Sequence, residues 1–194
     1  MPTPEVPGIV TAGQLDATAA RIAEWQLPNG MIPRFPGGHA DPWNQVEAAM
    51  ALDFVGLHEP DTKEYQWLFV IHRPDGSWHQ YYLEDSIEQD KLDANVIAYV
   101  APGVWHHDLI TEDRGFLEAA WPVVDRAIEF VLDLQTPRGE IIWARHADGT
   151  PWSFALLTGS SSVCHSLRWS GKRRATPYDP SRARPPLLPT GTVP

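Results

Sequence analysis

A short turn signature occurs three times in this 194-residue chain, each time after a stretch with helical apolar spacing. The copies span residues 26–32 (Gln-x-Pro-x-Gly-x-Ile), 72–78 (His-x-Pro-x-Gly-x-Trp) and 135–141 (Gln-x-Pro-x-Gly-x-Ile). Proline ends a helix, glycine permits a positive φ, and the last apolar residue can fold back onto the helix just ended. The copies begin 46 and 63 residues apart, which suits one helical hairpin each. The repeat therefore predicts an all-α chain of three hairpins, although 19 Pro and 14 Gly also leave chance matches open.

Apolar spacing predicts six helices in three pairs. The expected helices cover residues 14–26, 42–57, 61–72, about 93–110, 114–135 and 152–169. Asp41 and Pro42 suit the N-cap and first position of the second helix, and Pro102-Gly103 is expected to kink or split the fourth. The second helix of each pair is richer in small residues and less charged, which favours a buried, inner position. Paired helices of this kind describe part of an α/α toroid, with hairpins at 14–58, 61–110 and 114–169.

Charge is distributed unevenly along the chain. The net charge is −10, but residues 1–169 carry −14 and residues 170–194 carry +4. The acidic balance argues against a nucleic-acid or anionic-membrane partner. No apolar run of about 18 residues and no signal peptide is visible, so we expect a cytoplasmic protein without a membrane span. The single cysteine, Cys164, fits a reducing compartment and is expected to be buried as a small hydrophobe.

The two ends differ in composition from residues 12–169, which we assign to the toroid. Residues 1–11 are expected to form a flexible N-terminus. Residues 170–194 are rich in proline and basic residues, lack amphipathic spacing, and are predicted to form a disordered C-terminal tail.

Three stretches resemble known toroid families. The segment 105–131, which begins Trp-His-His and continues through Thr-Glu-Asp-Arg-Gly-Phe-Leu, resembles an outer hairpin of the six-hairpin glycosidases, which are (α/α)6 barrels. The segment Asp75-Gly76-Ser77-Trp78 is similar to the tandem Gln-x-x-x-Gly-x-Trp motif of terpenoid cyclases and protein prenyltransferases. Residues 12–168 also resemble the N-terminal half of actinobacterial proteins labelled prenyltransferases, through the segments 32–39, 103–107 and 155–159.

The resemblance implies a ring of five or six hairpins, whereas this chain predicts three. We interpret the chain as a truncated, incomplete enzyme, with an ordinary flexible tail as the alternative. Half a ring would leave apolar faces of inner helices exposed, which predicts self-association.

Candidate site residues lie on the loops that lead into the inner helices, at 30–43, 76–93 and 139–152. Glycoside hydrolysis normally requires two carboxylates, and we select Glu47 and Asp93 as the catalytic candidates. Aromatic rings stack on sugars, and charged groups bind hydroxyls. The predicted substrate-binding residues are Arg34, His39, Asp41, Trp43, Trp78, Asn95, Trp105, His106 and Glu140.

Several of these residues have a simpler structural interpretation. A helix cap is the favoured role of Asp41 and an alternative for Asp93. Glu47 has apolar neighbours, so a buried functional carboxylate and a solvated helix position are both open. His106 and His107 point about 100° apart on a helix, which favours one core and one surface histidine over a metal site.

Three functions remain open at this stage. The first is a carbohydrate-active protein that hydrolyses glycosides in its intact form. The second is a prenyltransferase-like or cyclase-like enzyme acting on an isoprenoid. It is weakened because no Asp-Asp-x-x-Asp, Asp-x-Asp-Asp or zinc-ligand pattern occurs. The third is a non-catalytic helical scaffold. We expect a small-molecule substrate and no cofactor or metal.

Overall fold

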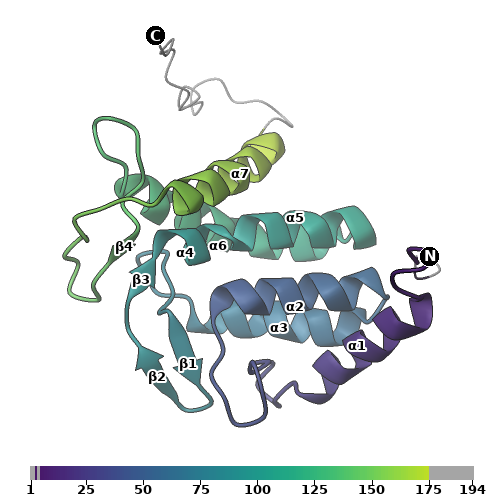
Figure 1. Ribbon diagram of the computed structural model, residues 1–194. Helices are drawn as coiled ribbons and strands as arrows, with labels where there is room; N and C mark the ends of the chain where they lie inside the picture. Colours follow the sequence, from purple (N-terminus) through teal and green to yellow (C-terminus); the bar gives the residue numbers. More distant parts are fainter. Residues whose placement is uncertain (1–2, 4, 175–194) are drawn as a thin grey trace.

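The computed structural model describes residues 3 and 5–174, with side chains up to residue 170 (Figure 1). Its helices are α1 (Ala12–Glu24), α2 (Pro42–Phe54), α3 (His58–Ile71), α4 (Ala94–Ala98), α5 (Val100–Thr111), α6 (Arg114–Asp133) and α7 (Leu157–Arg174). Its strands are β1 (Tyr81–Leu83), β2 (Ser86–Gln89), β3 (Leu92–Asp93) and β4 (Ala144–Arg145).

The helices form two layers, as the pairing predicted. Helices α1, α3 and α6 are the first members of the three pairs, and α2, α4–α5 and α7 are the second members. Helix α2 packs against α1, α3 and α5, and α5 in turn packs against α6 and α7. The second members therefore form a continuous inner layer, and the stack runs from α1 at one end to α7 at the other (Figure 1). The predicted all-α hairpin architecture is confirmed.

The three signature turns share one conformation. Gly30, Gly76 and Gly139 have φ values of +97°, +91° and +103°, which only glycine adopts without strain. In each turn the glycine N–H donates to the carbonyl three residues earlier, as in Gly30 N to Leu27 O at 2.9 Å. The carboxamides of Gln26 and Gln135 donate to the carbonyls of Gly30 and Gly139 at 3.1 and 3.0 Å. The three copies therefore share backbone conformation and hydrogen bonding as well as sequence.

The fourth predicted helix is interrupted one turn earlier than expected. The break falls at Tyr99, between α4 and α5, and Pro102 lies in the first turn of α5, where a missing N–H costs little. Gly103 lies within that helix, and a Cβ there would overlap the Val46 and Tyr65 side chains of α2 and α3, so the position suits glycine. Close packing, rather than a kink, explains this glycine.

Three further expectations concern the ends of the chain and Cys164. Helix α7 continues to Arg174, so the predicted start of the tail at residue 170 is wrong, and residues 175–194 lie outside the described part. Cys164 is exposed on α7, which corrects its predicted burial. Within residues 3 and 5–174, none of the helices has the length and apolar character needed to cross a bilayer.

Candidate functional site

Backbone hydrogen bonds join the three loops that lead into the inner helices. Ala40 of the first loop exchanges both backbone bonds with Tyr82 of the second, at 2.8 and 2.9 Å. In the second and third loops, β3 pairs with β4, and Ala94 N donates to Trp143 O at 2.9 Å. The loops therefore form one continuous surface, called the mouth below, beside the strands in Figure 1.

Asp41 caps α2 and is buried, with an exposed fraction of 1%. One of its oxygens accepts from Asn44 N at 3.0 Å, and the other accepts from Arg34 Nη2 at 2.7 Å and Nε at 3.1 Å. The Arg34 guanidinium lies 5.5 Å from the centre of the Tyr81 ring. These charge-assisted hydrogen bonds hold the first loop in place. Asp41 therefore acts as the N-cap of α2, which was its favoured role in the sequence.

His39 and Tyr81 form a second contact between the first two loops. Their rings stack with centroids 4.3 Å apart and planes 21° apart. His39 Nδ1 lies 2.8 Å from a Glu88 carboxylate oxygen, and both side chains are partly exposed. His39 therefore lies at the rim of the mouth, where a ligand could reach it.

Trp43 and Tyr99 stack face to face at the start of the inner layer. Their ring centroids are 3.7 Å apart and the planes differ by 9°. Both side chains are partly exposed, and the carboxylate of Glu47, one turn further along α2, is exposed. Burial raises the pKa of Tyr99, and the neighbouring Glu47 carboxylate, which it hydrogen-bonds, raises it further. An aromatic stack, a protonated phenol and an accessible carboxylate thus meet at one place.

Asp93 is occupied by structural contacts. Its exposed fraction is 4%, and one oxygen accepts from Asn95 N and Val96 N at 3.0 and 3.3 Å, which caps α4. The other oxygen lies 3.2 Å from Lys91 Nζ, which itself sits 4.5 Å from the centre of the Trp143 ring. A carboxylate held in this way is poorly placed for proton transfer, so the catalytic prediction for Asp93 is not supported.

Asn95, by contrast, keeps a buried amide oxygen without a hydrogen-bond partner in the described part of the chain. The residue is partly exposed at the start of α4. It lies beside the Asp93 cap, at the mouth, and remains a candidate for binding a ligand hydroxyl.

Two predicted ligand residues are structural instead. Trp78 is 1% exposed, and its indole N–H donates to Leu68 O at 2.8 Å, so it belongs to the core. Glu140 accepts from Thr136 Oγ1 at 2.5 Å and from Arg138 Nη2 at 2.6 Å within the third signature turn. The hydrogen bond from Thr136 is the main reason why the pKa of Glu140 is lowered.

The remaining two predictions lie on α5, away from the mouth. Trp105 packs against Trp169 of α7, with ring centroids 5.3 Å apart, and its indole nitrogen is buried without a partner among the described residues. Both rings line a small, mainly apolar cavity. His106 is partly exposed and lies 3.8 Å from Asp53, while His107 is buried. His107 is thus the core histidine, as expected, whereas His106 is only partly exposed and approaches the same Asp53 oxygen.

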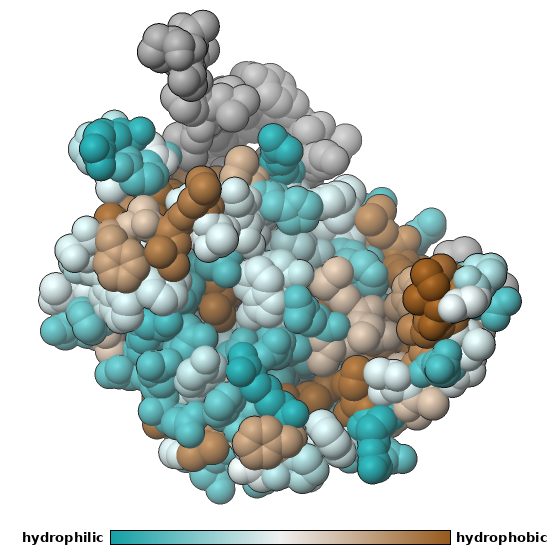
Figure 2. All heavy atoms as spheres, viewed as in Figure 1, coloured by the Kyte–Doolittle hydropathy of each residue, from teal (hydrophilic) through white to brown (hydrophobic). Residues whose placement is uncertain are grey.

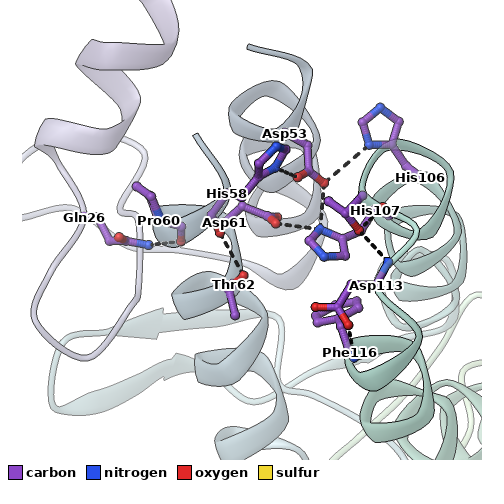
Figure 3. A network of polar contacts seen from close by, with 11 residues as sticks. Gln26, Asp53, His58, Pro60, Asp61, Thr62, His106, His107, Asp113 and Phe116 are labelled. Carbon is purple, nitrogen blue, oxygen red and sulfur yellow. Dashed lines mark hydrogen bonds and ion pairs between the residues drawn. The ribbon is translucent and has the colours of Figure 1, made fainter. Parts of the chain in front are cut away.

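A buried polar cluster at the opposite end of the helices is not apparent from the sequence (Figure 3). Asp53 lies in the last turn of α2, Asp61 near the start of α3, and His107 near the end of α5. His107 Nδ1 is 2.9 Å from Asp53 and 2.7 Å from Asp61, and His58 Nδ1 lies 2.9 Å from the other Asp53 oxygen. The cluster therefore ties the first hairpin to both helices of the second.

Burial, hydrogen bonds and mutual charge shift the pKa values of Asp53, Asp61 and His107. Burial alone would raise the pKa of Asp53, but hydrogen bonds with His107 and His58, and the nearby His106 imidazole, bring it well below its usual value. Burial raises the pKa of Asp61 to about 6, helped by the Asp53 charge. Burial opposes ionisation of His107, yet bonds to both carboxylates raise its pKa to about 9. The raised pKa favours the protonated form of His107 between the two acidic groups.

The same three side chains have the composition of a cation site. One nitrogen and two carboxylate oxygens lie within 4.8 Å of one another. Such ligands suit a divalent ion like Zn²⁺, but a protonated His107 balances the buried charge equally well. The three residues come from α2, α3 and α5, so no local spacing in the sequence indicates the site.

Solved structures with similar folds are α/α toroids that act on sugars. An unsaturated glucuronyl hydrolase specific for heparin superposes with a TM-score of 0.64 and 14% identity, over 82% of this chain and 49% of that one. An endoglucanase of glycosyl hydrolase family 8 from Klebsiella pneumoniae superposes with a TM-score of 0.55 and 16% identity, over 66% of this chain and 44% of that one. A D-mannose isomerase superposes with a TM-score of 0.60 and 10% identity, over 89% of this chain and 49% of that one. The predicted toroid fold is thereby confirmed.

A curated relative is similar in sequence as well. The chain is 51% identical over 165 residues to an enzyme of Mycolicibacterium hassiacum named MMP endo-(1,4)-3-O-methyl-alpha-D-mannosidase. The match covers 85% of this chain but 46% of the relative, so the chain spans about half its length. No family model matches the chain. These relatives give no support to the isoprenoid alternative.

Proposed function

We propose that this chain forms part of the active-site mouth of a carbohydrate-active toroid that hydrolyses α-(1,4)-linked mannosides bearing 3-O-methyl groups. The 51% identity to the M. hassiacum mannosidase is the observation that carries the substrate class. The sugar-processing character of the structural relatives agrees with it. Methylation makes a sugar more apolar, which suits a mouth rich in aromatic side chains.

The Trp43–Tyr99 stack and Glu47 are the parts of the mouth that best fit this chemistry. An aromatic face binds the C–H and methyl groups of a sugar, and a carboxylate is needed to transfer a proton or to attack the anomeric carbon. Glu47 is exposed, whereas Asp41 and Asp93 are engaged as helix caps and in ion pairs. We therefore assign the catalytic carboxylate of this part of the ring to Glu47, and a positioning role to Tyr99, which hydrogen-bonds it.

The partly exposed residues around this centre form the proposed binding surface. Arg34 and His39 lie at the rim formed by the first two loops, and Asn95 presents an amide oxygen that has no hydrogen-bond partner among the described residues. Sugar hydroxyls both donate and accept hydrogen bonds, so an arginine, an imidazole and an amide together can select among them. Trp78 and Glu140 have no part in the proposal.

The test uses a synthetic α-(1,4)-linked oligosaccharide of 3-O-methylmannose. Calorimetry measures binding, and mass spectrometry measures the products of hydrolysis. We expect Glu47→Gln to retain binding within about threefold, because the shape is preserved, while any hydrolysis falls by at least ~100-fold. Glu129→Gln, at an exposed position on α6, is the matched control and should behave as the unsubstituted chain.

Two results would contradict the proposal. Failure of the unsubstituted chain to bind the methylated oligosaccharide would remove the substrate class. Hydrolysis that persists undiminished in Glu47→Gln would remove the assigned carboxylate while leaving the substrate class intact.

A further inference from the structure

The three signature turns differ in what covers them. A Cβ on Gly30 would overlap the carbonyl oxygen of Lys63 on α3, and a Cβ on Gly76 would overlap that of Arg126 on α6. Each of these turns is therefore pressed against the first helix of the next hairpin. For Gly139, no described atom lies within 4 Å of the place that a Cβ would take. Gly139 is also exposed, whereas Gly30 and Gly76 are buried.

The two occupied contacts share one register. Lys63 lies nine residues before His72, and Arg126 lies nine residues before Gln135, and these two residues each begin a signature. A turn thus docks on the outer helix of the following hairpin at a fixed distance from that hairpin's own turn. In α1 the equivalent residue is Ala17, nine before Gln26, and it is exposed.

The side chain that begins the signature supports the same contact. The Gln26 carboxamide donates to its own turn at Gly30 O and also to Pro60 O of α3, at 2.7 Å. The Gln135 carboxamide makes the equivalent bond to Gly139 O, and within the described residues it has no acceptor on a following helix. By register the matching acceptor in α1 is the Gln14 carbonyl, twelve residues before Gln26.

We propose that two copies of this chain associate about a two-fold axis, with the Gly139 turn of each docked on Ala17 in α1 of the other. The free turn follows α6, at the α7 end of the stack, and α1 lies at the opposite end (Figure 1). A two-fold axis makes the two contacts identical, so the assembly closes rather than growing into a filament. Three hairpins from each copy complete a ring of six.

Two observations favour a second copy as the occupant. The solved toroids are about twice as long as the matched region, since the chain covers 44–50% of each. Apolar surface is also available at the α7 end of the stack: Leu156 and Leu157, at the start of α7, are 37% and 85% exposed. Figure 2 shows apolar residues gathered near this end of the molecule and again near the N-terminal segment that precedes α1. The inference is independent of the proposed substrate.

Light scattering coupled to size exclusion tests the assembly on the full chain. We expect twice the chain mass of 21.7 kDa. Ala17→Glu places a charge in the docking position and should shift the protein to monomer, raising the dimer dissociation constant at least ~10-fold. Ala119→Glu makes the same substitution at an exposed alanine of α6, away from the docking position on α1, and should remain dimeric. A monomer at ~100 µM, or a dimer that tolerates Ala17→Glu, would overturn the proposal.

A cross-linking experiment tests the register directly. In a Cys164→Ser background, one population carries Ala17→Cys and a second carries Arg138→Cys, in the residue before Gly139. After mixing under mild oxidation, we expect a disulfide between the two different copies, because the Cα atoms would come within bonding range. Replacing Ala17→Cys with Thr18→Cys should lower the yield several-fold. Equal yields from both mixtures would rule out the proposed register.

Discussion

His107 Nδ1 lies 2.9 Å from Asp53 Oδ2, although 54 residues separate the two in the chain. This contact joins the ends of two inner helices, α2 and α5, on the side opposite the mouth. Asp61 of α3 approaches the same nitrogen at 2.7 Å. One imidazole thus links three helices.

Stability should fall as the pH rises from 7 to about 10. The pKa of His107 is raised to about 9 in the folded protein, above its value of about 6.5 in an unfolded chain. A raised histidine pKa gives stability that is full below ~6.5 and is lost as the pH rises through the folded value. We expect a loss of about 2 kcal/mol in the free energy of unfolding, measured by urea denaturation. His107→Gln should flatten this dependence, and an unchanged slope in that variant would contradict the assignment.

Asp53→Ala should destabilise the fold strongly. It leaves His107 and Asp61 buried without their central partner, and breaking such a pair costs about 3–5 kcal/mol. Chemical denaturation measures the change. Asp133→Ala, whose carboxylate is 70% exposed and pairs with Arg145, is the matched control and should cost less than about 1 kcal/mol. Similar losses of unfolding free energy in both variants would show that the buried cluster stabilises the fold no more than an exposed ion pair does.

Replacing the signature glycine by alanine should lower the free energy of unfolding more in the second turn than in the third. Gly76→Ala combines a φ of +91° with overlap against the Arg126 carbonyl, so we expect a loss of about 3 kcal/mol or more. Gly139→Ala meets only the strain of a φ of +103° and should cost about 1 kcal/mol. Urea unfolding under conditions where the chain is monomeric compares them, and equal losses would contradict the difference in packing.

Trp43→Ala should weaken binding of the methylated oligosaccharide by about 3–10-fold, the usual value of an aromatic contact. Trp43→Phe retains a ring that can stack and should recover part of the affinity. Calorimetry measures both, and an unchanged unfolding midpoint shows that the variants keep their fold. Unchanged affinity in Trp43→Ala would move the binding surface away from this stack.

Local rules account for the part of the fold that the sequence could predict. The signature turns, the Asp41 cap and the inner position of the second helices follow from chain chemistry within a few residues. The close approach of Val46 and Tyr65 to Gly103 could not be predicted in this way, because the three residues belong to three different helices. The same limit applies to Trp78, whose place in the core depends on α3.

The site shows the same division between local chemistry and tertiary contact. By itself the sequence determined three hairpins, their turns and the loops that form the mouth, because these depend on helix endings and apolar spacing. Only the tertiary structure decided that Trp43 stacks on Tyr99 and that Asp53, Asp61 and His107 meet. Those contacts join residues of different loops and helices, and the distance between such residues is set by helix packing rather than by their separation along the chain.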